Sequence, residues 1–283
     1  MNIYSCVDSK NIDKLIVLFY SCFINCSKKD NFNFFILTDS NDYDIPRIPL
    51  DIIDNVTIKT VEFNDRWMTL LNDFNNNFYQ DCSWCKSNMN FARFLFFKVF
   101  PDIDRAIYLD WDMIVTADIY DIEYAYNSTN DMVISRINER SIYQNIFNAS
   151  FKGNLYSKNT LKIKSVLEQL NTNSKKICTL SHFCAGFFIV SSIHFEELYL
   201  IDFIQNLINI QEKYRCFNFG TQAVMNLMHL DNRLYVSKLW NYTPDPHIID
   251  TIKIIHWNGK DKPWTDKDNK RNSIWWKYYD LIH

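Results

Sequence analysis

Glycine and proline are scarce in this chain, which has only 4 Gly and 6 Pro among its 283 residues. The few that fall within a motif therefore carry information. An excess of positive charge is also lacking, because 30 Lys and Arg against 33 Asp and Glu give a net charge of −3. Without a basic stripe, the sequence argues against nucleic acid as the main partner.

Long apolar runs are lacking as well. The longest nearly apolar stretch, residues 15–24, is interrupted by Ser21 and has about half of the roughly 20 residues that span a bilayer. The first ten residues have neither the early basic region nor the apolar stretch of a signal peptide. We therefore expect a cytoplasmic protein without a transmembrane segment.

The chain contains 8 Cys but only one C-x-x-C pair, Cys82 and Cys85. A structural zinc site of this kind needs a second pair at similar spacing, and none is present in the sequence. The sequence therefore does not favour zinc. In a cytosolic chain, cysteines are expected to be small buried residues or free thiols.

Hydrophobic residues make up 47% of the chain and aromatic residues 16%, so a sizeable core is expected and long disorder is not. Strand and helix patterns alternate along the chain. We predict strands at 2–7, 33–38, 56–61, 105–109, 131–135, 183–190 and 251–255. We predict helices at 11–26, 89–100, 159–170, 192–213 with Ser192 as N-cap, 221–228 and 272–282. This order favours an α/β fold with a mainly parallel sheet covered by helices on both faces, in a single domain over 1–283.

Two carboxylates, Asp110 and Asp112, follow the short apolar run 105–109, and a second apolar run follows them. Burying two nearby carboxylates is costly unless positive charge is close. A divalent cation such as Mg²⁺ or Mn²⁺ is the simplest source of that charge, and an exposed turn is the alternative. Asp8 and Asp39 also follow strands, where open α/β sheets bind ligands, although Asp39 is better explained as a cap.

An arginine lies within the apolar helix predicted at 89–100. A buried guanidinium needs an anionic partner, so Arg93 pairs either with the acidic residues or with a bound phosphate.

A third group of polar residues follows the last predicted strand, in the sequence HWNGKDKPW. Its His256 could complete a metal site, Gly259 allows close backbone approach, and Lys262 could neutralise a phosphate leaving group.

Taken together, these segments resemble family 8 of the retaining glycosyltransferases, the group that includes glycogenin and bacterial lipopolysaccharide galactosyl- and glucosyltransferases. The resemblance rests on the opening strand with Asp8 and on FARF, YLDWD, CAGFF, TQAVMN and HWNGKDKPW, which occur in the family's order. It implies a GT-A fold, with a mixed, mainly parallel sheet flanked by helices. It also implies a UDP-sugar donor and a metal, Mn²⁺ with Mg²⁺ as the alternative.

The resemblance also implies roles for individual residues. Asp110, Asp112 and His256 would hold the metal, and Gln222, Lys262 and Arg93 would be catalytic. Asp8 would meet the uracil base, and Gln222 would lie beside the anomeric carbon. The residues implied in donor binding are Cys6, Asp8, Arg93, Asp110, Trp111, Asp112, Ala185, Gly186, Gln222, Gly259 and Lys262.

Two positions depart from the family pattern, because Cys184 and Thr221 stand where the family usually has Asn and Asp. Both missing groups normally contact the donor sugar, so the departures concern the identity of that sugar. We predict hexose transfer from UDP-glucose or UDP-galactose to a glycan, protein or lipid-linked acceptor, with retention and by front-face attack. A catalytically silent nucleotide-sugar-binding protein is the alternative.

The C-terminal residues 265–283 are rich in aromatic side chains, with Trp275, Trp276, Tyr278 and Tyr279 close together. We expect a helical extension that packs on the domain through one aromatic face. The sequence leaves open a weak peripheral contact of the other face with a membrane surface.

Overall fold

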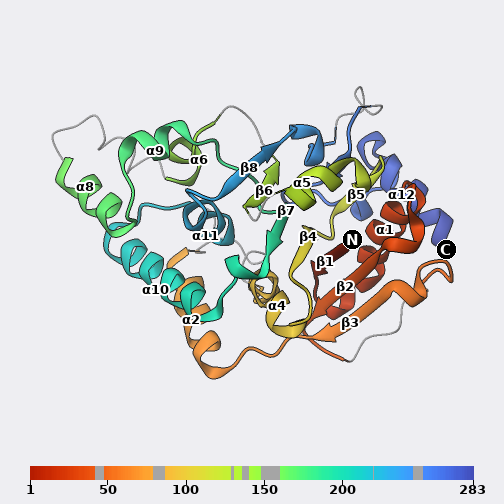
Figure 1. The fold of residues 1–283 in the computed structure, drawn as a ribbon, viewed down its shortest axis with the longest axis horizontal. Helices are drawn as coiled ribbons and strands as arrows, with labels where there is room; N and C mark the ends of the chain where they lie inside the picture. The colour runs from red at the N-terminus through yellow and green to blue at the C-terminus, as the bar shows by residue number, and fades with distance from the viewer. Residues whose placement is uncertain are drawn as a thin grey trace.

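The computed structural model describes residues 1–41, 48–78, 87–128, 131–135, 140–147, 160–218, 220–244 and 251–283. Cys82 and Cys85 lie outside the described residues. Within them, the strands form one seven-stranded sheet and one two-stranded sheet. Helices lie on both sides of the strands, and the end of the molecule formed by α2, α8 and α10 is far from the C-terminus (Figure 1).

The large sheet has the order β3-β2-β1-β4-β7-β6-β8. Its strands are β1 (Asn2–Cys6), β2 (Asn33–Thr38), β3 (Val56–Thr60), β4 (Arg105–Leu109), β6 (Met132–Ser135), β7 (Phe187–Ser191) and β8 (Arg233–Val236). The pairs β1–β2, β2–β3, β1–β4 and β6–β8 are parallel, whereas β7 runs antiparallel to both β4 and β6. The predicted mixed, mainly parallel sheet is confirmed.

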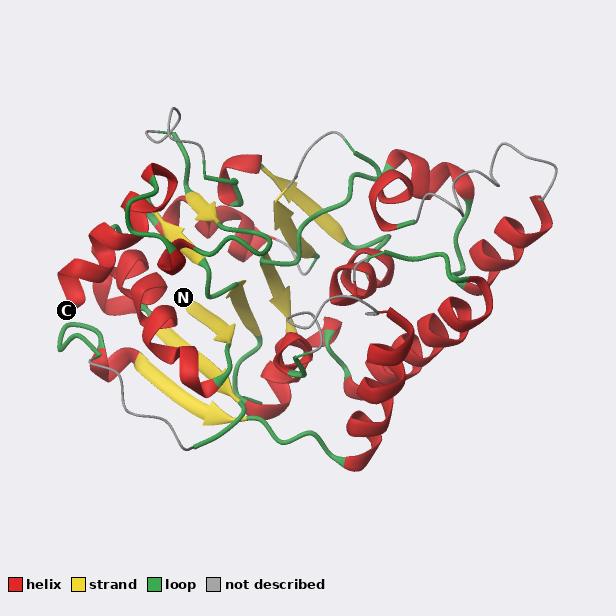
Figure 2. Cartoon of the chain, turned by 180° about the vertical axis from the view of Figure 1, so that it is seen from behind, coloured by secondary structure: helices red, strands yellow, loops and turns green. Residues whose placement is uncertain are grey.

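The main helices are α1 (Ile12–Ile24), α2 (Asp65–Phe78), α3 (Met89–Ala92), α4 (Phe96–Val99), α8 (Thr160–Gln169), α10 (Glu197–Tyr214), α11 (Gly220–Met228) and α12 (Ser273–Ile282). The other helices are α5 (Glu123–Ser128), α6 (Ile142–Ile146) and α9 (Ser174–Thr179). Figure 2 shows from behind how the helices flank the strands.

Both faces of the central strands β1, β4, β6 and β7 are buried, and successive residues of one strand point to opposite faces. In β1, Ile3 packs with the α1 side chains Leu15 and Phe19, whereas Tyr4 belongs to the cluster that includes α2, α10 and α11. Tyr4 stacks on Phe96 of α4, with ring centroids 4.0 Å apart. Apolar helices on each side of the sheet therefore fix the plane from which the site residues project.

Several predicted boundaries are wrong. The helix predicted at 192–213 begins at Glu197, because the carboxylate of Glu196 caps it by accepting from Leu198 and Tyr199 N–H, and Ser192 opens a separate 3₁₀ turn. The helix predicted at 89–100 is divided by a 3₁₀ turn at Arg93–Leu95. The strand predicted at 183–190 begins only at Phe187, which leaves residues 183–186 irregular.

The second sheet pairs β5 (Met113–Val115) antiparallel with β9 (Ile254–His256). The strand predicted at 251–255 therefore begins later and includes His256. Helix α12 packs against α1, with Trp275 and Tyr278 buried and Tyr278 Oη accepting a hydrogen bond from Asn25 at 2.6 Å. No helix in the described part of the chain is both long enough and apolar enough to cross a bilayer.

Candidate active site

A cavity of about 800 Å³ opens at the carboxyl ends of the parallel strands β1 and β4. This is the edge at which open α/β sheets bind their ligands. Its lining comes from the segments after β1 and β4, from α3 and from the loop after β9. The lining includes Cys6, Asp8, Ser9, Lys10, Asp39, Asn90, Arg93, Tyr108, Asp110, Trp111, Asp112, His256, Gly259, Lys260, Lys262 and Trp264.

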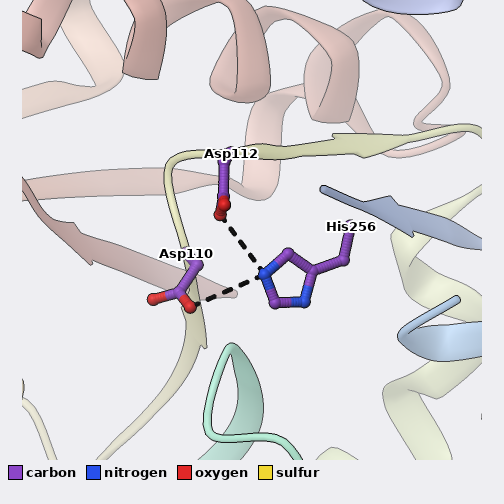
Figure 3. A group of neighbouring side chains, drawn as sticks. All are labelled: Asp110, Asp112 and His256. Carbon is purple, nitrogen blue, oxygen red and sulfur yellow. Dashed lines mark ion pairs between the residues drawn. The ribbon is translucent and has the colours of Figure 1, made fainter. Parts of the chain in front are cut away.

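Two carboxylates and one imidazole meet in this cavity (Figure 3). Nε2 of His256 lies 3.3 Å from Oδ1 of Asp112 and 3.8 Å from Oδ2 of Asp110. One ligand atom from each side chain lies within 4.8 Å of the others, so the group could hold a metal ion. Carboxylate oxygen together with imidazole nitrogen suits a divalent transition metal such as Mn²⁺.

The pairing of β5 with β9 brings these residues together. The residues 110–112 form the turn between β4 and β5, and the register places Met113 opposite His256. The N–H of Trp257 donates to the carbonyl of Asp112 at 3.1 Å. Residues more than 140 positions apart therefore meet through ordinary antiparallel pairing.

Lys262 contributes positive charge to the same group, because Nζ bonds to Oδ2 of Asp112 and donates to the Trp257 carbonyl at 3.1 Å. Burial tends to raise the pKa of Asp112, but His256 and Lys262 outweigh burial and hold that pKa well below its usual range. For His256, burial tends to lower the pKa, but Asp112 raises it well above its usual value. The buried Asp112 and the half-buried Asp110 thus require nearby positive charge, and their donor set with His256 fits a divalent cation.

Arg93 is committed to protein partners. Its Nη1 donates to the Ala185 carbonyl at 2.7 Å, and its Nη2 lies 3.4 Å from Oδ1 of Asp110. The guanidinium lies over the ring of Tyr108, whose hydroxyl donates to Asp110 at 2.6 Å. The acidic partner considered from the sequence is therefore present in the structure as Asp110.

The irregular segment 184–186 packs against the acidic group. The carbonyl of Gly186 accepts from the Asp110 N–H at 2.8 Å. A Cβ atom on Gly186 would lie 2.5 Å from Cε1 of His256 and 2.8 Å from Oδ2 of Asp110, so only glycine fits there. Cys184, expected near the donor sugar, has its Sγ 3.8 Å from Nδ1 of His256.

The remaining predicted residues are only partly brought together. Cys6, Asp8, Trp111 and Gly259 line the cavity, and Gly259 has a φ of +113°, which favours glycine. Ala185 contributes its carbonyl to Arg93. Gln222, half-buried on α11, is not among the described residues that line the cavity.

The interpretation of Asp39 as a cap agrees with the structure. Its Oδ1 accepts from the N–H of Ser9, the first residue of a 3₁₀ turn, at 2.7 Å. Burial tends to raise the pKa of Asp39, but its hydrogen bonds with Ser9 lower it overall. Asp8 accepts from the hydroxyl of Ser87 at 3.1 Å and keeps its carboxylate in the cavity.

Sequence reasoning missed two residues of the site, Tyr108 and Asn241, whereas Trp264 belongs to the HWNGKDKPW motif. Tyr108 holds Asp110 and stacks under Arg93, and it could have been suspected because it ends the strand that leads to the acidic turn. Trp264 stacks on Trp111 with ring centroids 4.6 Å apart. Asn241 contacts His256, and the sequence gives no signal for it, because it lies in a polar stretch without a motif.

Known proteins resemble this chain in sequence. The model of the family "Glycosyl transferase family 8" matches residues 2–268. The Arabidopsis thaliana protein named "Probable galacturonosyltransferase-like 9" is 24% identical over 293 residues, which cover 97% of this chain and 70% of that protein. A second, "Probable galacturonosyltransferase-like 2" from the same plant, is 24% identical over 69% of this chain and 58% of its own length.

Solved structures share the fold. The galactosyltransferase LgtC, solved in complex with donor and acceptor sugar analogs, superposes with a TM-score of 0.65 at 14% identity, over 99% of this chain and 96% of that one. Mouse xyloside xylosyltransferase 1 superposes with a TM-score of 0.58 at 12% identity, over 91% of this chain and 98% of that one. The fold is the GT-A fold.

Proposed function

Because the chain belongs to glycosyl transferase family 8 and is a glycosyltransferase, we propose that it transfers a hexose from a UDP-sugar to a hydroxyl acceptor. UDP-glucose and UDP-galactose are the first donors to test. The transfer retains the anomeric configuration and depends on a divalent metal. One observation carries the proposal: Asp110, Asp112, His256 and Lys262 face one cavity together with Asp8.

The cavity has the parts that a nucleotide diphosphate requires. Asp8 lies at its β1 side, where its carboxylate can accept from the uracil N–H. Asp110, Asp112 and His256 would hold the metal, which would offset the negative charge on the departing diphosphate. Lys262 lies beside Asp112 and, released from it, can donate to a phosphate oxygen.

Arg93 supports the transfer through Asp110 and the Ala185 carbonyl, whose positions it fixes. In the proposed step, the bond between the anomeric carbon and the diphosphate oxygen breaks and the acceptor oxygen bonds to the same face of that carbon. The acceptor proton passes to the departing phosphate. Gln222 is proposed to stand beside the anomeric carbon, which requires its side chain to reach the donor from α11.

The identity of the sugar on the UDP donor is a separate part of the proposal. Cys184 lies against His256 rather than presenting an amide to a sugar hydroxyl, so the family's usual contact is missing. Two relatives carry galacturonosyltransferase in their names, which adds UDP-galacturonate to the donors worth testing. A glycan, a protein and a lipid-linked sugar are the acceptors proposed.

The test is UDP release from UDP-glucose, UDP-galactose and UDP-galacturonate, with Mn²⁺ or Mg²⁺ and with a chelator. We expect release with at least one donor, faster with Mn²⁺ and abolished by the chelator. Retention is checked by the anomeric proton of the product in NMR. UDP binding without turnover of any donor would favour a silent nucleotide-sugar-binding protein, and turnover in the chelator would reject the metal.

A further inference from the structure

Behind the imidazole of His256, on the side away from the two carboxylates, lies a buried amide. Oδ1 of Asn241 is 2.8 Å from Nδ1 of His256. Both side chains are almost completely buried, with 5% of Asn241 and 3% of His256 exposed. The two ring nitrogens of His256 therefore have different partners, the amide at Nδ1 and the acidic pair at Nε2.

The backbone around Asn241 holds the same histidine. Tyr242 pairs with Ile255 in a parallel bridge, and its carbonyl accepts from the His256 N–H at 2.8 Å. The buried Trp240 stacks with Phe187 of β7, which anchors the segment to the large sheet. Neighbouring residues of one segment thus fix both the backbone and the ring of His256.

We propose that Asn241 is a positioning residue that keeps Nδ1 of His256 protonated and directs the Nε2 lone pair toward a metal held by Asp110 and Asp112. In this orientation the amide presents Oδ1, which accepts but cannot donate, and the tautomer that completes the bond carries its hydrogen on Nδ1. Metal-binding histidines commonly donate their second N–H to such a partner, which fixes tautomer and ring orientation. This inference rests on the metal site of the proposed function.

An amide suits this position better than a carboxylate. The site already holds two carboxylates, and a third behind the ring would add buried negative charge. The same hydrogen bond persists whether Nε2 carries a proton or faces a metal, so the ring need not turn when the metal binds. The only other described polar side chain near Nδ1 is Cys184, whose Sγ is 3.8 Å away and is a weak acceptor.

The experiment measures the Kd for Mn²⁺ by titration calorimetry of the full chain with saturating UDP. Asn241→Leu keeps the branched shape and the number of heavy atoms of the side chain and Asn241→Ala does not, but both remove the acceptor. We expect both to weaken Mn²⁺ binding by about 10- to 100-fold, as loss of such partners does elsewhere. Asn241→Asp, which keeps an acceptor, should stay closer to wild type. Asn55→Ala, which removes an amide that donates to the Phe32 carbonyl, should leave Kd unchanged.

A double-mutant cycle separates positioning from general destabilisation. In a His256→Ala background, Asn241→Leu should have no further effect on Kd, because its route to the metal is gone. The inference would be overturned if Asn241→Leu weakened Mn²⁺ binding equally in both backgrounds. It would also be overturned if Asn241→Leu or Asn241→Ala bound Mn²⁺ with wild-type affinity. A wild-type protein that binds no Mn²⁺ would instead reject the metal dependence of the proposed function.

Discussion

Two histidines with nearly the same burial have opposite acid–base behaviour. His256, in the acidic region with Asp110 and Asp112, has a pKa well above its usual value, because Asp112 outweighs burial. His229, just after α11, has a pKa lowered to about 3 by burial, aided by His194 and Arg233. The two residues are 3% and 5% exposed, so the neighbouring charges, and not burial, decide the difference.

The comparison shows what distinguishes a site from a core. The acidic region concentrates negative charge and requires a compensating cation, supplied here by Lys262 and the His256 ring. Around His229 the neighbours are aromatic or positive, with the ring of His194 5.1 Å away and nearly perpendicular. A buried histidine there stays neutral. The predictions below test this division.

The largest effect is expected from Asp112→Asn, which removes the charge that both His256 and Lys262 face. Transfer should fall by about 10³-fold or more, since one lost electrostatic contact alone costs 10²–10³. UDP release measures the loss, and circular dichroism checks the fold. Asp121→Asn is the matched control, because Asp121 pairs with Lys253 on the surface, where ion pairs contribute little. Retained activity in Asp112→Asn would remove the acidic region from the chemistry.

Lys262→Ala should lower kcat by about 10²-fold, because the departing diphosphate loses a preorganised donor. Steady-state kinetics with the active donor measure the change, and Lys253→Ala serves as the control for loss of a paired surface lysine. If only KM rises, Lys262 binds donor and transition state equally and does not act on the leaving group.

Gly186→Ala should weaken Mn²⁺ binding by about 10-fold, because the new methyl group would press on His256 and Asp110. Calorimetric titration with UDP present measures Kd. Unchanged Kd in Gly186→Ala would mean that the three metal-binding groups tolerate displacement.

The smallest effect on transfer is expected from His229→Leu, which lies outside the acidic region. In the wild type, the unfolded chain takes up a proton near pH 6.5 and the folded chain only near pH 3. The free energy of unfolding should therefore decrease as the pH is lowered through this window, by up to about 1.4 kcal/mol per pH unit. Urea denaturation at several pH values measures this free energy. Its decrease toward low pH should be smaller for His229→Leu than for the exposed control His283→Leu. Equal slopes would contradict a neutral His229.

Much of this arrangement could be predicted from the sequence. The strand before Asp110 and the strand that ends at His256 have clear apolar patterns. Their meeting could not be predicted from parallel pairing, because β9 lies outside the large sheet and pairs antiparallel with β5. The edge strand β8 was missed because its pattern RLYV is only half-buried. Helix α2 was missed because asparagines dominate its second half. The roles of Arg93 and Cys184 depended on partners distant in sequence, which no local pattern specifies.

The stacked indoles of Trp111 and Trp264 have an optical consequence. Trp111 lines the cavity, and Trp264 stacks on Trp111. Trp275 of α12 meets Trp264 edge-on, with ring centroids 5.7 Å apart. A nucleotide that enters the cavity changes the surroundings of the first indole, and the others lie close enough to exchange excitation energy with it. The intrinsic fluorescence of the unlabelled chain therefore offers a direct signal for donor binding.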